Sequence, residues 1–175
     1  MNEAVADLPR GPAAHSRAAI ARWVALLLPL ALLAGAFGSQ YLGGLNPCEM
    51  CWWQRYPHMA AAVLAALAFT APADTGRSRG LTLLAALAIA VSGAIGVHHA
   101  GVELKIFEGF TTCTATSRGA STADLLRQIT AAPLVRCDQV QWSFLGISLA
   151  GWNAILSLSG AAAILWLSLT SRRRG

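Results

Sequence analysis

The sequence is poor in charge. Only 12% of its 175 residues are Asp, Glu, Lys or Arg, whereas 55% are hydrophobic and the mean hydropathy is +0.53. An ordinary soluble domain carries about 25% charged residues, so this chain has too little charge to coat one. Disorder is excluded by the same numbers, because it requires low hydrophobicity together with high charge. The composition therefore leaves a small membrane protein or an unusually apolar soluble one, and the length of the apolar segments decides between them.

Four long segments are almost free of charge, at about residues 22–42, 56–73, 81–99 and 146–169. Each is close to the roughly 17–25 residues that a helix needs to cross a bilayer. Only helices and closed barrels span bilayers, and the alternating pattern of a barrel strand is absent from the sequence. We therefore predict one all-α membrane domain over 1–175, a four-helix transmembrane bundle with loops at 43–55 and 100–145 on one side.

The basic residues predict which side of the membrane each loop occupies. Eight arginines lie in the two terminal tails and in the turn between the second and third segments, where they outnumber the acidic residues by five. The other two loops carry equal numbers of basic and acidic residues. The positive-inside rule places both termini in the cytoplasm and the neutral loops outside. Because the basic residues form short separate clusters without a nucleic-acid-binding motif, we expect no nucleic-acid partner.

The first segment has one alternative interpretation. Ala34-Gly35-Ala36 has the form of a signal-peptide cleavage site, preceded by Arg22 and an apolar run. Cleavage there would leave the orientation of the remaining segments unchanged.

All four cysteines lie in the two outer loops: Cys48, Cys51, Cys113 and Cys137. On an oxidising face such cysteines form disulfides, and two structural crosslinks are one interpretation. However, Cys48-Glu49-Met50-Cys51 is a CxxC motif, which is typical of pairs that cycle between dithiol and disulfide. It stands at the start of the second segment, where a helix N-terminus stabilises a thiolate. Arg55 adds positive charge and Glu49 opposes it, so the sequence leaves the sign of the net pKa shift open.

The cysteine spacing argues against a metal centre. Structural zinc sites usually combine two pairs of closely spaced ligands, whereas Cys113 and Cys137 are separated by 23 residues. His58 and His99 are both expected near the outer surface, which does not suit haem ligation between spans. We therefore expect no metal.

Three motifs resemble the DsbB family of bacterial disulfide-bond formation proteins. Residues 47–55, Pro-Cys-Glu-Met-Cys-Trp-Trp-Gln-Arg, resemble the family's first-loop motif. Residues 99–103 resemble the end of its third span, and residues 137–148 resemble the run from its last cysteine into the fourth span. The resemblance extends over roughly residues 20–170. The departures are Glu49-Met50 within the first pair and the 23-residue separation of the second pair.

The resemblance implies a protein-disulfide:quinone oxidoreductase of the bacterial inner membrane, with the cysteines in the periplasm. Such an enzyme reoxidises a soluble thioredoxin-fold thiol oxidase, a DsbA-like partner, and passes the electrons to a membrane quinone, either ubiquinone or menaquinone. Carried over by position, Cys113 forms the mixed disulfide with the partner, and Cys137 is its companion in the loop.

The same carry-over assigns the membrane end of the site. Cys48 and Cys51 take the electrons from the second pair, and Arg55 and His99 bind the quinone. The second pair must then lie on a segment able to reach both the partner and the CxxC. Within it, residues 121–129 have the pattern of a short amphipathic helix on the membrane surface, with a plain surface loop as the alternative.

Two other functions fit parts of the pattern. One is a quinone reductase like the vitamin K epoxide reductase family, although that family carries its CxxC late in the chain. The other is a non-catalytic membrane protein with two structural disulfides. Within the spans, we expect Gly93 and Gly96 to permit close helix packing, and Asn153 to donate an interhelical hydrogen bond.

Overall fold

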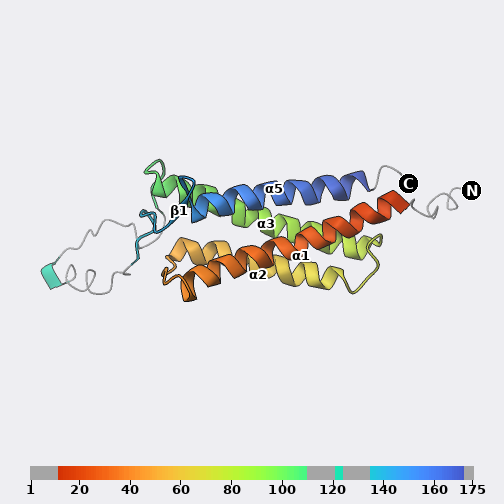
Figure 1. Cartoon of the computed structure of the whole chain (residues 1–175), viewed down its shortest axis with the longest axis horizontal. Coiled ribbons are helices and arrows are strands. Elements are labelled where there is room, and N and C mark those ends of the chain that lie inside the picture. The colour runs from red at the N-terminus through yellow and green to blue at the C-terminus, as the bar shows by residue number, and fades with distance from the viewer. Residues whose placement is uncertain (1–11, 110–120, 124–134, 172–175) are drawn as a thin grey trace, which may run out of the picture.

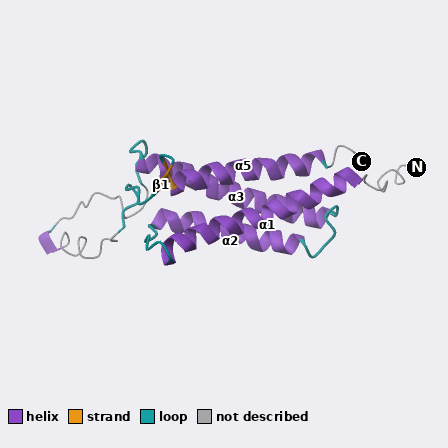
Figure 2. Cartoon of the chain, in the orientation of Figure 1, coloured by secondary structure: helices purple, strands orange, loops and turns teal. Residues whose placement is uncertain are grey.

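Four long helices make up most of the computed structural model, which describes residues 12–109, 121–123 and 135–171. They are α1 (Pro12–Tyr41), α2 (Glu49–Ala68), α3 (Gly76–Glu103) and α5 (Leu149–Thr170). A two-stranded antiparallel ribbon of β1 (Ser143–Phe144) and β2 (Ile147–Ser148) precedes α5. The helices run side by side along the long axis of the molecule (Figures 1 and 2). The predicted all-α class is thus confirmed as a mainly helical chain with four helices.

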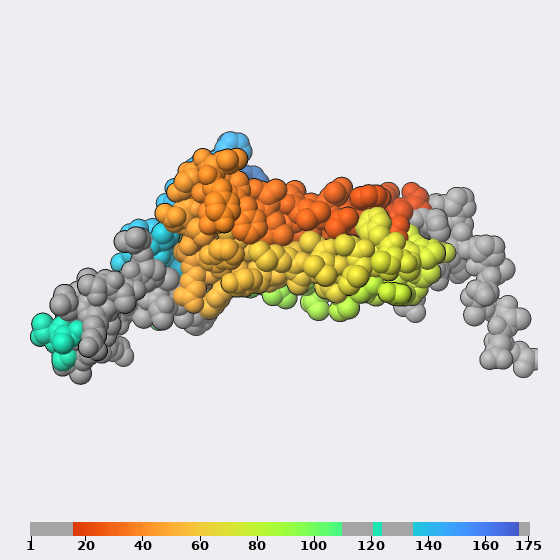
Figure 3. Space-filling model, turned by 90° about the horizontal axis from the view of Figure 1, so that it is seen from below, coloured from red at the N-terminus to blue at the C-terminus, as the bar shows by residue number. Residues whose placement is uncertain are grey.

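Small residues fill the interior between the helices. The buried core consists of alanines with two isoleucines, namely Ala21, Ala25, Ala61, Ala65, Ala85, Ala86, Ala161, Ile89 and Ile164. Many large apolar side chains point outward instead, including Leu27, Leu67, Leu87 and Trp166. Figure 3 shows α1 and α2 lying lengthwise along one face of the molecule. Small residues inside and large apolar ones outside are what helix packing in lipid favours.

The predicted close approach at the glycines is confirmed. A Cβ atom added to Gly96 would lie 3.0 Å from the Ala150 carbonyl oxygen and 3.1 Å from the Ala154 nitrogen. One added to Gly93 would lie 2.9 Å from the Leu158 side chain. The backbone of α3 therefore packs closely against α5 at these glycines, where an added Cβ would force a neighbour to shift.

Three of the described helices have the length and hydropathy of membrane spans: Ser16–Tyr41 within α1, Gly76–Glu103 and Leu149–Thr170. Helix α2 carries Gln54, Arg55 and His58 and does not reach that hydropathy. It also begins at Glu49, well before the expected start of the second span at 56, because Cys48 caps its N-terminus. The CxxC therefore belongs to the first turn of the helix. The amphipathic helix expected at 121–129 lies largely outside the described residues.

Candidate active site

The two cysteines of the CxxC are in direct contact at the N-terminus of α2. Their Sγ atoms are 2.8 Å apart, and the Cys51 N–H donates to Cys48 Sγ at 3.3 Å. Cys48 is buried, whereas Cys51 is partly exposed. The N-cap thiol of Cys48 thus accepts one of the N–H groups that have no partner within the first turn of the helix.

Cys137 packs against the same pair. It is fully buried and forms one apolar cluster with Cys48, Met50 and Val102. Its side chain is hydrogen-bonded to the Cys48 thiol. One cysteine of the long loop is therefore already in contact with the CxxC, a contact that the sequence left open. Cys113 lies outside the described residues.

The contacts between the thiols give the two CxxC cysteines opposite acidities. Hydrogen bonds to Cys137 and Cys51, together with burial, raise the pKa of Cys48. The hydrogen bond from Cys48 lowers the pKa of Cys51, and the positive charge of Arg55 contributes in the same direction. Hydrogen bonding to the charged form and a nearby opposite charge both favour ionisation. Cys51 is therefore the thiol that forms a thiolate more readily, which settles the sign of the shift at that residue.

Ion pairs attach the Cys137 segment to the end of α3. The Lys105 ammonium donates to the backbone oxygen and to Oδ2 of Asp138, both at 2.7 Å. Arg136 donates to the two carboxylate oxygens of Asp138 at 2.9 Å each. These two cations hold the pKa of Asp138 well below its usual range. The residue next to Cys137 is thus fixed by charge-assisted hydrogen bonds that position the buried sulfur.

Arg55 is buried under two aromatic rings. Its guanidinium donates to Gln40 Oε1 at 2.5 Å and to the Ala36 carbonyl at 3.0 Å, both on α1. The guanidinium carbon lies 4.8 Å from the ring centroids of both Phe37 and Trp52. Because the cation is only 6% exposed, its direction is set by packing.

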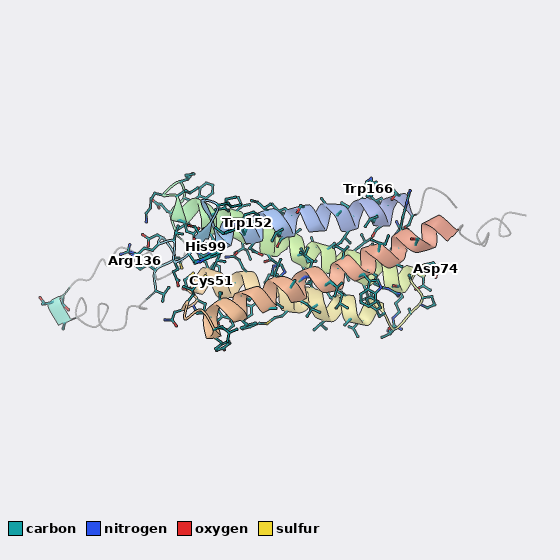
Figure 4. All side chains as sticks on the ribbon, viewed as in Figure 1. Cys51, Asp74, His99, Arg136, Trp152 and Trp166 are labelled. Atoms are coloured by element: carbon teal, nitrogen blue, oxygen red, sulfur yellow. The ribbon has the colours of Figure 1, made fainter. Side chains whose placement is uncertain are left out.

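A cavity of about 440 Å³ opens beside these groups. This is within the roughly 300–1,000 Å³ typical of small-molecule sites. The predicted site residues Cys48, Cys51, Arg55 and His99 all line it, and most of the remaining wall is apolar. Figure 4 shows Cys51 and His99 toward the same end of the helices, with Trp152 nearby. The structure therefore brings together every predicted site residue that it describes. Four of them line the cavity, and Cys137 contacts the lining residue Cys48.

His99 contacts both the sulfur and a buried amide. Its Nε2 is 3.6 Å from Cys48 Sγ, and its Nδ1 is 2.8 Å from Gln54 Nε2. Gln54 Nε2 also donates to the Met50 carbonyl at 3.2 Å, which can only accept. That atom is therefore the amide nitrogen, so Nδ1 of His99 accepts and Nε2 carries the proton in the neutral ring. His99 thus presents its Nε2–H to Cys48 Sγ and to the backbone carbonyl of Cys137.

The donor atoms of Cys48, Cys51 and His99 lie within 4.8 Å of one another. Thiolate and imidazole are the ligand types of zinc sites. In the observed arrangement, however, the imidazole nitrogen facing the sulfur carries a proton and donates it. The absence of a metal stays an expectation from the sequence.

A polar network connects this site to the interior of the bundle. Asn153 Nδ2 donates to Gln54 Oε1 at 2.8 Å and to the Ser92 carbonyl at 3.2 Å, which confirms the predicted interhelical hydrogen bond. Asn153 Oδ1 lies 2.9 Å from Nε2 of His58. The sequence reasoning did not assign Gln54, Ser92 and His58 to the site. Polar side chains within apolar helices were the available signal.

Comparison with known proteins identifies the family. The family model described as "Disulfide bond formation protein DsbB" matches residues 18–167. The chain belongs to the DsbB family. A curated relative from Azoarcus sp. (strain BH72), named "Disulfide bond formation protein B", is 34% identical over 155 residues, which cover 82% of this chain and 87% of the relative.

Two further relatives carry the same name. The one from Aromatoleum aromaticum is 31% identical over 166 residues, covering 86% of this chain and 94% of its own. The one from Marinobacter nauticus is 30% identical over 145 residues, covering 77% of this chain and 83% of its own. No solved structure matches the chain. The resemblance found in the three motifs is therefore confirmed, and DsbB membership with three candidate spans indicates a multi-pass membrane protein with a disulfide-forming role.

Proposed function

We propose that this chain is a membrane thiol–disulfide oxidoreductase that reoxidises a periplasmic, DsbA-like thiol oxidase and passes the electrons to ubiquinone or menaquinone. One observation carries the proposal: Cys137 contacts Cys48, while Cys51 lines a cavity beside Arg55. The three sulfurs thus lead from the long loop to a largely apolar cavity. Two purely structural disulfides would not require the three sulfurs to lie in this order between the loop and the cavity.

The sulfur contacts support the following sequence of exchanges. A thiolate of the reduced partner attacks Cys113 in a Cys113–Cys137 disulfide, which releases Cys137 as a thiolate. Cys137 then attacks Cys48 of the oxidised CxxC, forming a Cys48–Cys137 disulfide and releasing the Cys51 thiolate. The buried contact between Cys137 and Cys48 supports this step, because exchange requires one sulfur to approach another directly.

The remaining steps return both pairs to the oxidised state. The second partner thiolate displaces Cys113, and the partner leaves as a disulfide. Cys113 attacks Cys137, which restores the loop disulfide and leaves Cys48 and Cys51 reduced. Quinone, when bound, accepts the two electrons and two protons that this dithiol loses on closing to a disulfide. Cys51 has the lowered pKa and lines the cavity, so we assign it as the sulfur that faces the quinone.

The cavity residues fit a quinone. Its wall is mostly apolar, and the anchored Arg55 guanidinium supplies a fixed positive charge next to Cys51. Such a charge stabilises both a thiolate and the negative charge that develops on a quinone oxygen. Arg55 and His99 would hold the ring. The N–H that His99 presents to Cys48 would stabilise that sulfur when it leaves the Cys48–Cys137 disulfide.

For the topology, we propose that α2 also crosses the membrane, as the second of four spans in chain order. It packs against α1 and α3. Both termini would then be cytoplasmic and the cysteines periplasmic in the inner membrane, as the arginine distribution indicates. The polar side chains of α2 face the bundle interior, where Gln54 and His58 are buried, so they do not oppose insertion.

The direct test is turnover. Purified protein in nanodiscs is mixed with a reduced thioredoxin-fold dithiol protein and a quinone, and quinone reduction is followed by absorbance. We expect Cys48→Ala and Cys113→Ser to abolish the reaction, and Ser159→Ala on the exposed face of α5 to leave it intact. Full activity in either cysteine variant would contradict the relay. We expect Arg55→Ala to raise the KM for quinone while both disulfides still form.

A further inference from the structure

His58 has a buried ring nitrogen that takes no part in the thiol–disulfide exchanges proposed above. The residue is 3% exposed and lines the cavity. Among the described residues, its Nδ1 atom has no hydrogen-bond partner. An unpartnered polar atom in an apolar interior is costly. Because His58 is one of the residues lining the cavity, the missing partner points to a ligand.

The protonation of the other ring nitrogen follows from the network around it. Asn153 Nδ2 is 3.2 Å from the Ser92 carbonyl oxygen, which can only accept, so this atom is the amide nitrogen. Its Oδ1 therefore faces His58 Nε2 at 2.9 Å. An amide oxygen only accepts, so Nε2 of His58 carries the hydrogen. In the neutral ring, Nδ1 is then a lone pair that accepts hydrogen bonds and donates none.

An acceptor at this position distinguishes the two redox forms of a quinone. The oxidised ring carries carbonyl oxygens, which only accept, whereas the reduced ring carries hydroxyl groups, which donate. We propose that His58 Nδ1 accepts a hydrogen bond from a hydroxyl of the reduced ring, so that the cavity binds the quinol more tightly than the quinone. This inference rests on the proposed function and adds the residue that recognises the product.

The spacing along α2 suits this role. Cys51, Arg55 and His58 lie on one face of the helix, as residues separated by three or four positions do, and all three line the cavity. Cys51 and His58 are seven positions apart, which is about 10 Å along a helix axis. That separation leaves room for one six-membered ring, with one oxygen toward the sulfur and Arg55 and the other toward His58.

Preference for the quinol favours electron flow out of the thiols. For a two-electron couple, each tenfold preference for the reduced form raises the reduction potential of the bound couple by about 30 mV. A bound quinone is then a stronger oxidant of the CxxC than a free one. His58 would thus act on the driving force of the reaction without contacting sulfur.

Two variants separate recognition from support of the network. His58→Gln keeps an N–H at the position of Nε2, and so keeps the bond to Asn153, but removes the acceptor at Nδ1. His58→Asn places an amide oxygen at the position of Nδ1 and removes the Nε2 donor. If His58 only supports the network, His58→Gln should weaken hydroquinone binding less than His58→Asn does. If His58 recognises the quinol, His58→Asn should weaken that binding less.

The measurement is binding of a short-chain ubiquinone and of its hydroquinone to protein in nanodiscs. A Cys48→Ser/Cys51→Ser background prevents turnover, so binding is separated from thiol chemistry. We expect His58→Gln to weaken hydroquinone binding about tenfold, the value of one buried hydrogen bond, with quinone binding unchanged. His58→Asn should bind hydroquinone almost as the parent does.

Each other result has a definite meaning. Unchanged hydroquinone affinity in His58→Gln, with normal binding by the parent, would overturn the inference and leave the proposed function standing. Hydroquinone binding that is weaker in His58→Asn than in His58→Gln would overturn it in favour of a structural role. Failure of the parent to bind either form would contradict the proposed quinone cavity itself.

Discussion

Asn153 on α5 holds the polar network together, and its removal should destabilise the whole bundle. We consider Asn153→Leu, which keeps the volume and removes the amide. The change leaves Gln54 Oε1 without its donor and His58 Nε2 without its closest acceptor. Ser92 keeps its hydroxyl bond to the Gln54 carbonyl. The buried Ser157 hydroxyl also loses Asn153 Oδ1, to which it donates at 3.0 Å. Three buried groups therefore lose their main partners.

The expected cost follows from those three groups. Interhelical hydrogen bonds in membranes average about 0.6 kcal/mol each, which gives a lower estimate of about 2 kcal/mol. Buried groups left unsatisfied cost about 1–3 kcal/mol each, which gives about 3–9 kcal/mol. Water entering through the cavity reduces the upper value, so we expect a loss of about 2–3 kcal/mol in the free energy of unfolding.

Reversible unfolding in mixed micelles, followed by circular dichroism, measures this loss. Ser159→Ala is the matched control, because its hydroxyl is exposed and bonds only to carbonyls of its own helix. That variant should stay within about 0.5 kcal/mol of the parent. A loss below about 0.5 kcal/mol in Asn153→Leu would show that the network contributes nothing to stability and would refute the reasoning from its contacts.

Three further predictions concern packing and thiol acidity. Gly96→Ala should cost about 1–3 kcal/mol of stability, because the added Cβ would meet the backbone of α5. The control Gly80→Ala, whose Cβ would lie in open space, should not lower stability. Equal unfolding curves for the two variants would refute this prediction. With the pKa of Cys51 lowered and that of Cys48 raised, iodoacetamide should label Cys51 first in the reduced protein near pH 7, as read by peptide mass spectrometry, and labelling of Cys48 first would contradict the assignment. Gln54→Leu removes the donor that fixes the histidine beside Cys48, so the pKa of Cys48 should rise further and its labelling should require higher pH; an unchanged pH profile would show that the amide has no such effect.

Local patterns made the helices, the CxxC position and the helix contacts predictable. Charge-free length indicated the helices, and the CxxC was expected at the start of the second one, although the capped first turn from Glu49 was not. Gly96 and Asn153 were predictable because small and polar residues within apolar helices have few other roles. In each case the information lies within a few residues of sequence.

Contacts between distant segments were not predictable in the same way. Cys137 lies far from Cys48 in sequence, and its burial depends on the attachment of Asp138 to Lys105 at the end of α3. Charge counting could not reveal that attachment, because it depends on where the chain turns. Likewise, the opposite acidities of the two CxxC thiols follow from which sulfur Cys137 touches.

The buried amides explain why two histidines of one site behave differently. Gln54 and Asn153 are each oriented by a backbone carbonyl, that of Met50 and that of Ser92. Those carbonyls cannot change their role as acceptors, so the two amides cannot rotate without losing bonds. Gln54 therefore donates to the His99 ring, so that the N–H of this ring points toward Cys48 Sγ, where negative charge develops. The other amide accepts from a ring and leaves the second nitrogen of that ring as an acceptor unpartnered among the described residues, which the proposal assigns to a quinol hydroxyl. Because α2 supplies both Gln54 and His58, its polar face lowers its hydropathy as a span for the same reason that it organises the site.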